Sequence, residues 1–175
     1  MKRTYHFLLP LLSLFLVRVD LTDLVPLRMS VKSVKVLDGD TMMVGIGRNQ
    51  FKVRLMYIDA PERGQTGNSI DFGDYSTDCL KKIIKEPKTL MVYGYDRYGR
   101  ILGEVDDLSI RMVLEGCAYL YEYAKFSSRA ERTKFLIAQN KAQKLQKGLW
   151  KFKVLNPHLY RKMKFKPLVK NTLTD

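Results

Sequence analysis

One stretch constrains the fold of this chain more than any other: residues Val36 to Arg63, which read VLDGDTMMVGIGRNQFKVRLMYIDAPER. It contains two runs in which apolar residues alternate with other residues, and a period of two predicts half-buried β-strands. Asp38-Gly39-Asp40 predicts a turn before the first run, and the residues from Gly45 to Asn49 predict a turn between the runs. Together with the alternating residues just before it, the stretch predicts three consecutive antiparallel strands.

The same hairpin brings charged side chains together. Pairing the second and third strands about Gly47 places Asp40 roughly opposite Arg54, and Asp59 follows a few residues later, at about 3.3 Å per strand residue. Pro61 ends this strand, because proline cannot donate a hydrogen bond to the ladder. Two carboxylates that are distant in sequence are therefore expected to meet at one end of one hairpin.

Further strands and helices are predicted downstream. Residues 89–95 and 101–105 predict two more strands, joined by the polar turn from Asp96 to Arg100. Helical spacing of apolar residues predicts a helix around residues 75–84, a short one after Asp107 or Ser109, and a last one from about Ser128 to Lys147. Five strands with about three helices indicate an α+β, β-rich fold built on a five-stranded OB-type barrel.

The N-terminus has the pattern of an export signal. Lys2 and Arg3 precede the apolar run Phe7 to Val17, which has the length of a signal-peptide core and is too short to span a bilayer comfortably. No small-residue cleavage site follows, so an uncleaved membrane anchor is the second form of this prediction. The protein is expected to be secreted or held in the cell envelope. The alternative is an upstream extension before a cytoplasmic chain that starts at Met29.

The chain thus divides into a signal or anchor with its linker (residues 1–28), one folded domain (residues 29–150) and a basic extension (residues 151–175). A total of 175 residues, 46% of them hydrophobic, suits one domain with modest extensions. The extension carries seven basic residues and one acidic residue, and it is expected to be partly ordered at best.

Charge and cysteine content limit the partners and the compartment. With 31 Lys and Arg against 18 Asp and Glu, the net charge of +13 favours nucleic acid or an anionic membrane surface as partner, although a merely soluble basic protein has the same composition. No protein partner is predicted, and a monomer is expected. Cys79 and Cys117 are too few for a disulfide scaffold and too far apart for a local zinc motif. Buried free thiols are expected, or one disulfide if the chain is exported.

The carboxylates in the hairpin indicate a site for a hard cation. Asp40 and Asp59 are oxygen ligands without a histidine or thiolate beside them in sequence, a set that suits Ca²⁺ or Mg²⁺ rather than zinc. Cleavage of a phosphodiester needs a cation, an activated water and donors for the charge that develops on phosphate. Because Glu62 and Arg54 lie close to the two aspartates, the stretch predicts a metal-dependent site that cleaves phosphodiesters.

Four motifs in this order, VLDGDT, FKVRLMYIDAPE, DRYGR and GLW, resemble those of the thermonuclease family, typified by staphylococcal nuclease. The resemblance runs from about Val31 to Trp150. It implies a Ca²⁺-dependent endonuclease that cuts DNA and RNA with little sequence preference and leaves 3′-phosphates. It also implies that Ca²⁺ is bound by Asp40, Asp59 and the backbone carbonyl of Ala60, where the staphylococcal enzyme has threonine.

The resemblance assigns roles to further side chains. Glu62 matches the residue that positions or deprotonates the attacking water. Arg54 and Arg100 match two phosphate-binding arginines, whose guanidinium forks can grip two oxygens at once. Three residues match, or lie near, positions that bind the substrate: Arg97, Tyr98 and Tyr121.

Other readings of the same residues remain. Arg54 could serve only as an ion-pair partner of Asp40, and Glu62 could be an exposed loop residue. In a different functional class, an OB barrel binds single-stranded nucleic acid without cutting it, although inactive modules of the family lose acidic or arginine positions that this chain retains. A membrane-surface protein that uses its basic tail would leave the acidic site unexplained.

Overall fold

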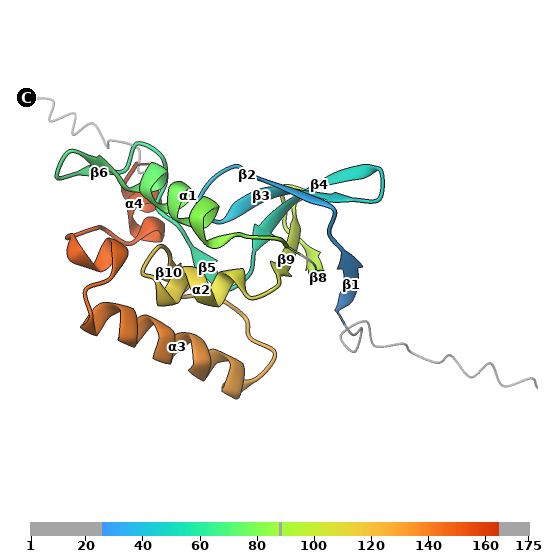
Figure 1. The fold of residues 1–175 in the computed structure, drawn as a ribbon. Helices are drawn as coiled ribbons and strands as arrows, with labels where there is room; N and C mark the ends of the chain where they lie inside the picture. The colour runs from blue at the N-terminus through green and yellow to red at the C-terminus, as the bar shows by residue number, and fades with distance from the viewer. Residues whose placement is uncertain (1–25, 88, 165–175) are drawn as a thin grey trace, which may run out of the picture.

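The computed structural model describes residues 26–87 and 89–164. Six strands form one sheet in the order β1-β8-β9-β4-β3-β2 (Figure 1). All neighbouring strands are antiparallel except β4 and β9, which pair in parallel. The strand bounds are β1 (Leu27–Ser30), β2 (Ser33–Val36), β3 (Thr41–Ile46), β4 (Asn49–Leu55), β8 (Thr89–Tyr95) and β9 (Ile101–Val105).

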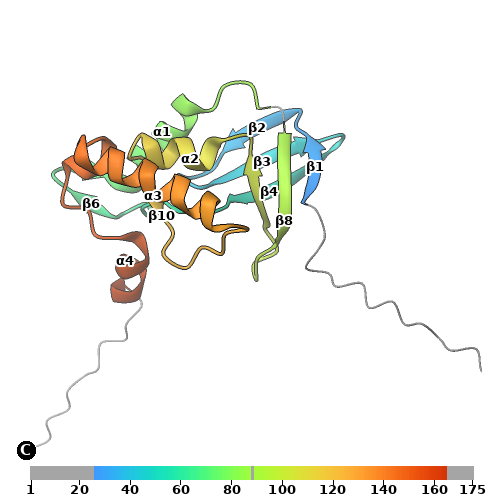
Figure 2. The ribbon, with the colours of Figure 1, turned by 90° about the horizontal axis from the view of Figure 1, so that it is seen from below.

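Helices gather on one side of the molecule, with α2 packed between α1 and α3, while β1 lies on the far side (Figure 2). Side chains cap the N-termini of α1 and α3, whereas Asp107, at the N-cap position of α2, makes no side-chain cap hydrogen bond. The Asp71 side chain accepts hydrogen bonds from two backbone N–H groups of α1, and the Ser128 hydroxyl accepts one from Glu131 in α3. The helices are α1 (Phe72–Ile83), α2 (Leu108–Leu114), α3 (Arg129–Lys144) and α4 (Pro157–Lys164), with a 3₁₀-helix at Gly148–Lys151 before α4.

Two short strand pairs complete the fold. β5 (Ile58–Asp59) pairs with β10 (Tyr119–Leu120), so that Asp59 lies opposite Tyr119. β6 (Thr66–Gly67) and β7 (Ile70–Asp71) form a small hairpin between Glu62 and α1. The first pair holds the end of the central hairpin against the segment that leads to α3.

The central prediction of three consecutive antiparallel strands is confirmed by β2, β3 and β4. Arg54 pairs in register with Thr41, one position from the predicted Asp40. The turn is tighter than the predicted Gly45–Asn49, because only Gly47 and Arg48 separate β3 from β4. Gly47 has φ +61°, a backbone conformation that glycine adopts without strain.

A mixed α+β fold with a strand-rich sheet is confirmed, but two details of the predicted architecture are wrong. The sheet is not a closed five-stranded barrel: it has six strands, and its edge strands β1 and β2 do not pair with each other. The extra strand, β1, is four residues long, too short to show a clear alternation in sequence. The described residues form four α-helices rather than about three, because the eight-residue α4 forms in the basic extension.

The hydrophobic core lies between the sheet and the helices. Alternate residues of β3 and β4 (Met42, Val44, Val53 and Leu55) are almost completely buried, as the period of two requires. Leu80 of α1 is equally buried in the same core. Full burial of such a side chain contributes about 1.5–3 kcal/mol, so the hairpin that carries the acidic residues is anchored firmly.

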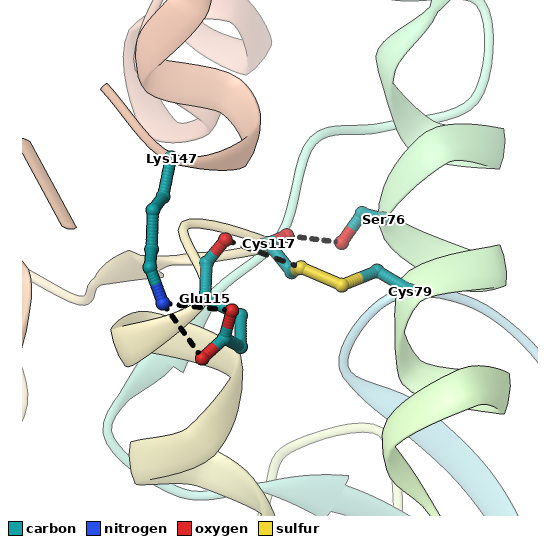
Figure 3. The surroundings of a disulfide bond; sticks show 5 residues. All are labelled: Ser76, Cys79, Glu115, Cys117 and Lys147. Atoms are coloured by element: carbon teal, nitrogen blue, oxygen red, sulfur yellow. Dashed lines mark hydrogen bonds and ion pairs between the residues drawn. A yellow bond between two sulfur atoms is a disulfide. The ribbon is translucent and has the colours of Figure 1, made fainter. Parts of the chain in front are cut away.

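The two cysteines form a disulfide, so the expectation of free thiols is wrong and the alternative of one disulfide holds. Cys79 lies in α1 and Cys117 lies in the turn after α2, and their Cα atoms are 6.1 Å apart (Figure 3). Beside the bond, the Ser76 hydroxyl donates to the Cys117 carbonyl at 2.6 Å, and Lys147 pairs with Glu115 at 3.0 Å. Sequence spacing did not reveal this proximity, because it arises from the packing of α1 against α2.

Most of the predicted signal or anchor segment lies outside the described residues, which begin at Pro26. Leu27 and Arg28, assigned to the end of that segment, belong to β1, which also includes Met29. Within the described ranges, no helix combines the length and the apolar character needed to cross a membrane.

Candidate active site

A cavity of about 1070 Å³ opens at the end of the central hairpin. Asp59 lies behind its wall and is 2% exposed. The other residues that the sequence singled out all line the cavity: Asp40, Arg54, Ala60, Glu62, Arg97, Tyr98, Arg100 and Tyr121.

The Asp38-Gly39-Asp40 turn holds the first carboxylate in place. The Asp38 side chain accepts a hydrogen bond from the Asp40 backbone at 3.1 Å, which fixes the turn. A Cβ atom at Gly39 would collide with the side chains of Ser76 and Ala60, so only glycine fits there. The buried Asp40 carboxylate accepts from the Ala60 backbone N–H at 2.9 Å and from the Thr41 hydroxyl at 3.0 Å.

Arg54 joins the two buried carboxylates. One arm of its guanidinium pairs with Asp40, and the other contacts Asp59 Oδ1 at 3.0 Å. Burial lowers the pKa of Arg54, and the charge of Asp59 opposes that effect. The group stays protonated in a protein. A single guanidinium therefore bridges Asp40 and Asp59.

Arg100 reaches the same site from the turn between β8 and β9. Its Nε donates to Asp96 at 2.7 Å, and its Nη1 lies 3.4 Å from the Thr41 hydroxyl, which in turn donates to Asp40. Burial by itself would raise the pKa of Asp96, because it disfavours the charged carboxylate. Hydrogen bonds from two backbone N–H groups and from the Arg100 guanidinium outweigh burial and lower this pKa overall. Asp96 and Thr41 therefore hold the arginine beside the carboxylates. Neither residue was assigned a role from the sequence, although Asp96 lies in the DRYGR motif and Thr41 in the VLDGDT motif.

Glu62 contacts a residue that sequence analysis missed. Its side chain is 46% exposed, and its Oε1 accepts from Arg161 Nη1 at 2.6 Å. The other arm of Arg161 contacts Asp59 Oδ2 at 2.7 Å. Burial lowers the pKa of Arg161, but its hydrogen bonds to Asp59 and Glu62 outweigh burial and raise it overall. Arg161 lies in α4, and the sequence offered no signal beyond the basic character of the extension.

The rim of the cavity is aromatic and basic. The exposed ring of Tyr98 lies 5.0 Å from the guanidinium carbon of Arg97 and 5.6 Å from that of Arg100, which are cation–π distances. The Tyr121 ring packs edge-to-face on Tyr123, with 5.7 Å between centroids. Such a rim offers both charge for phosphates and flat surfaces for bases.

The donor set fits a hard divalent cation. Among the described residues, no three His, Cys, Asp or Glu side chains gather around one point. Asp40 and Asp59 nevertheless provide two buried carboxylates beside the backbone of Ala60, and all of these ligands are oxygens. Mg²⁺ and Ca²⁺ complete such a set with water and substrate oxygens. The two guanidiniums on Asp59 already place positive charge at this point.

Fold and cavity together define an α+β protein with buried carboxylates in an arginine-lined cleft. Residues 52–152 match the family described as "Staphylococcal nuclease homologue", and the chain belongs to this family. It is 37% identical over 123 residues to an "Uncharacterized endonuclease" of Escherichia coli, an alignment that covers 67% of this chain and 74% of the relative.

Two further relatives carry nuclease names. A "Micrococcal nuclease" of Shigella flexneri is 30% identical over 131 residues, covering 67% of this chain and 71% of the relative. A "Thermonuclease" of Staphylococcus hyicus is 30% identical over 130 residues, covering 68% and 74%. The resemblance read from the four motifs is confirmed, and these relatives support a hydrolytic nuclease function.

Proposed function

We propose that this protein is a Ca²⁺-dependent endonuclease that hydrolyses phosphodiester bonds of DNA and RNA with little sequence preference and leaves 3′-phosphates. The observation that supports it most is the meeting of Asp40, Arg54, Glu62 and Arg100 around one cavity, with Asp59 buried behind its wall and paired with Arg54, although these residues come from separate segments. This set contains cation ligands, a proton acceptor and two phosphate clamps, and hydrolysis at phosphorus needs all three.

The side chains divide the reaction between them. Asp40, Asp59 and the carbonyl of Ala60 would hold the cation, which supplies Lewis-acid stabilisation of the phosphate when bound. Glu62, exposed at the cavity wall, positions the attacking water and accepts its proton as the new P–O bond forms. Arg54 and Arg100 neutralise the charge that develops on the phosphoryl oxygens, and the P–O5′ bond breaks, after which the leaving O5′ takes a proton from solvent water to become a 5′-hydroxyl.

A cleavage assay tests this proposal. The purified protein is incubated with plasmid DNA, a single-stranded DNA oligonucleotide or RNA, in Ca²⁺ or in chelator. We expect cleavage of all three in Ca²⁺ and none in chelator. Products that a polymerase extends only after phosphatase treatment would carry the expected 3′-phosphates. Unchanged cleavage in chelator would exclude the cation, and binding without cleavage would favour the non-catalytic binding module.

We also propose that the protein works as a monomer outside the cytoplasm, as a secreted or envelope protein. The Cys79–Cys117 disulfide supports this location, because such bonds persist in oxidising compartments. Cell fractionation, with N-terminal sequencing of the product, tests it. A reduced protein found only in the cytoplasm would contradict it.

A further inference from the structure

α4 lies beyond the residues that match the family, yet it is held at the mouth of the cavity. The Tyr160 hydroxyl donates to the Gly64 carbonyl at 3.0 Å, and the Gln65 amide donates to the Leu155 carbonyl just before the helix at 2.6 Å. The His158 ring packs on Tyr123, with 5.0 Å between centroids. These contacts join the helix to the loop after Glu62 and to the aromatic rim, so α4 has a defined position.

From this position Arg161 contacts an oxygen of Asp59 that a divalent cation would need as a ligand. Asp59 has two carboxylate oxygens: Oδ1 accepts from Arg54 and Oδ2 accepts from Arg161. A divalent cation that binds Asp59 must share or replace one of these contacts. Arg161 is the easier to displace, because its side chain is 31% exposed, whereas that of Arg54 is 17% exposed and also bound to Asp40.

The balance of charge also favours the replacement of Arg161 by a divalent cation on Asp59. Asp40, Asp59 and Glu62 carry three negative charges, and Arg54 and Arg161 supply two positive ones. Arg54 together with a divalent cation would neutralise all three carboxylates without Arg161. The guanidinium of Arg161 would then be a free cation that lines the same cavity as Arg97 and Arg100, facing the place of a phosphate.

We propose that Arg161 is a further substrate-binding residue: it holds Asp59 and Glu62 in the cation-free protein and binds a nucleic-acid phosphate when a divalent cation takes its place on Asp59. The inference rests on the cation site of the proposed function. It makes α4 part of the active site, although this helix lies outside the matched family region. By linkage, whatever strengthens the contact of Arg161 with Asp59 must weaken cation binding.

Calorimetric titration of the full chain with Ca²⁺ tests the first half. The variants are Arg161→Ala and, as a matched control, Lys162→Ala, which removes the same charge from an exposed neighbour in α4. We expect Arg161→Ala to bind Ca²⁺ at least about 5-fold more tightly than the control, because a competitor for Asp59 has gone. Equal affinities in the two variants would overturn the exchange. If the wild-type protein binds no Ca²⁺, the proposed cation site itself fails.

Binding of a single-stranded phosphorothioate DNA oligonucleotide, followed by fluorescence anisotropy, tests the second half. In saturating Ca²⁺ we expect Arg161→Ala to bind about 10-fold more weakly than Lys162→Ala, since a charge-assisted phosphate contact is lost. In chelator the difference between the two variants should be smaller than in Ca²⁺, because Arg161 of the control is then engaged by Asp59 and Glu62. Equal binding in Ca²⁺ would overturn the role in substrate binding. Thermal unfolding of both variants verifies that they are folded.

Discussion

At the scale of single residues, the site depends on which arginine pairs with each of four carboxylates. Arg54 bridges Asp40 and Asp59, Arg100 is held by Asp96, and Arg161 bridges Asp59 and Glu62. Asp40 and Asp59 are buried, and an unpaired buried charge is costly. Each cation that leaves a buried carboxylate must therefore be replaced by another, and under the proposed function this would link substrate, metal and protein contacts in one network.

Glu62→Gln tests the assignment of the proton acceptor. The amide keeps an oxygen that can accept from Arg161 but cannot take a proton from water, so we expect kcat to fall by about 10²–10⁴-fold. Oligonucleotide binding should change little. The measurement is cleavage under saturating substrate, with anisotropy for binding, and Glu122→Gln, on an exposed residue outside the cavity, is the control. Parallel loss of binding and turnover would indicate that Glu62 has a structural role.

Glu104 should make stability depend on pH. Burial raises its pKa to about 8, although the Ser109 backbone donates to it, and its Oε2 has no hydrogen-bond partner among the described residues. Between the ordinary value of 4.5 and about 8, the unfolded chain loses this proton while the folded chain keeps it. Its contribution to stability therefore falls as pH rises through this window, by at most about 1.4 kcal/mol per unit.

The corresponding variant is Glu104→Gln, which is neutral at every pH. We expect its Tm to exceed that of the wild type near pH 8 and the difference to shrink toward pH 5. Thermal unfolding monitored by circular dichroism across this range gives the result. A Glu104→Gln protein with the same pH profile as the wild type would show that Glu104 is ionised in the fold.

At the scale of elements, the disulfide ties α1 to the turn after α2, and both pack behind the central hairpin. Ser76, one turn before Cys79, fills the space above Gly39 in the acidic turn and also bonds the Cys117 carbonyl. The cross-link therefore lies directly behind the support of Asp40. Loss of the bond should reduce the stability of the fold without altering the chemistry of the cavity.

Reduction of the Cys79–Cys117 bond, or the double change Cys79→Ala and Cys117→Ala, should lower the free energy of unfolding by about 2–4 kcal/mol. The loop that it closes spans 38 residues in sequence, and closing it restricts the unfolded chain. Urea unfolding with and without reductant measures the effect. An unchanged unfolding midpoint would mean that the cysteines are not paired in solution.

At the scale of the whole molecule, the basic side chains are not all placed where they could contact nucleic acid. The cavity is lined by Arg54, Arg97, Arg100 and Arg161, whereas α3 contributes no residue to it. The basic residues Lys134 and Lys141 of α3 are exposed and face solvent. We therefore interpret α3 as a solvated face and the arginines of the cavity as the electrostatic contact with nucleic acid.

Salt dependence distinguishes the two surfaces. With three or four phosphate contacts in the cavity, a plot of log affinity for a single-stranded oligonucleotide against log salt should have a slope of about −2 to −3. The double variant Lys134→Gln and Lys141→Gln should leave this slope unchanged, and Arg97→Gln should reduce it. Anisotropy titrations over a series of salt concentrations supply the values. A shallower slope in the α3 variant would place α3 in the nucleic-acid interface.

Local features of this protein follow from its sequence alone. Alternation with a period of two is set by strand geometry, so the hairpin of β3 and β4 could be predicted along with the position of Arg54 near Asp40. The Asp38-Gly39-Asp40 turn and the motif around Arg100 could also be recognised in the sequence, because each consists of residues only a few positions apart.

Contacts between distant segments are visible only in the folded chain. The pairing of Cys79 with Cys117, the open edges of the sheet and the contact of Arg161 with Asp59 and Glu62 join residues that no local pattern connects. Such contacts depend on how helices and loops pack across the whole chain, and no short stretch of sequence specifies that packing. The spacing of apolar and polar residues indicates which face of a helix or strand a side chain occupies. The residue that this side chain contacts is set by the assembly of the whole fold.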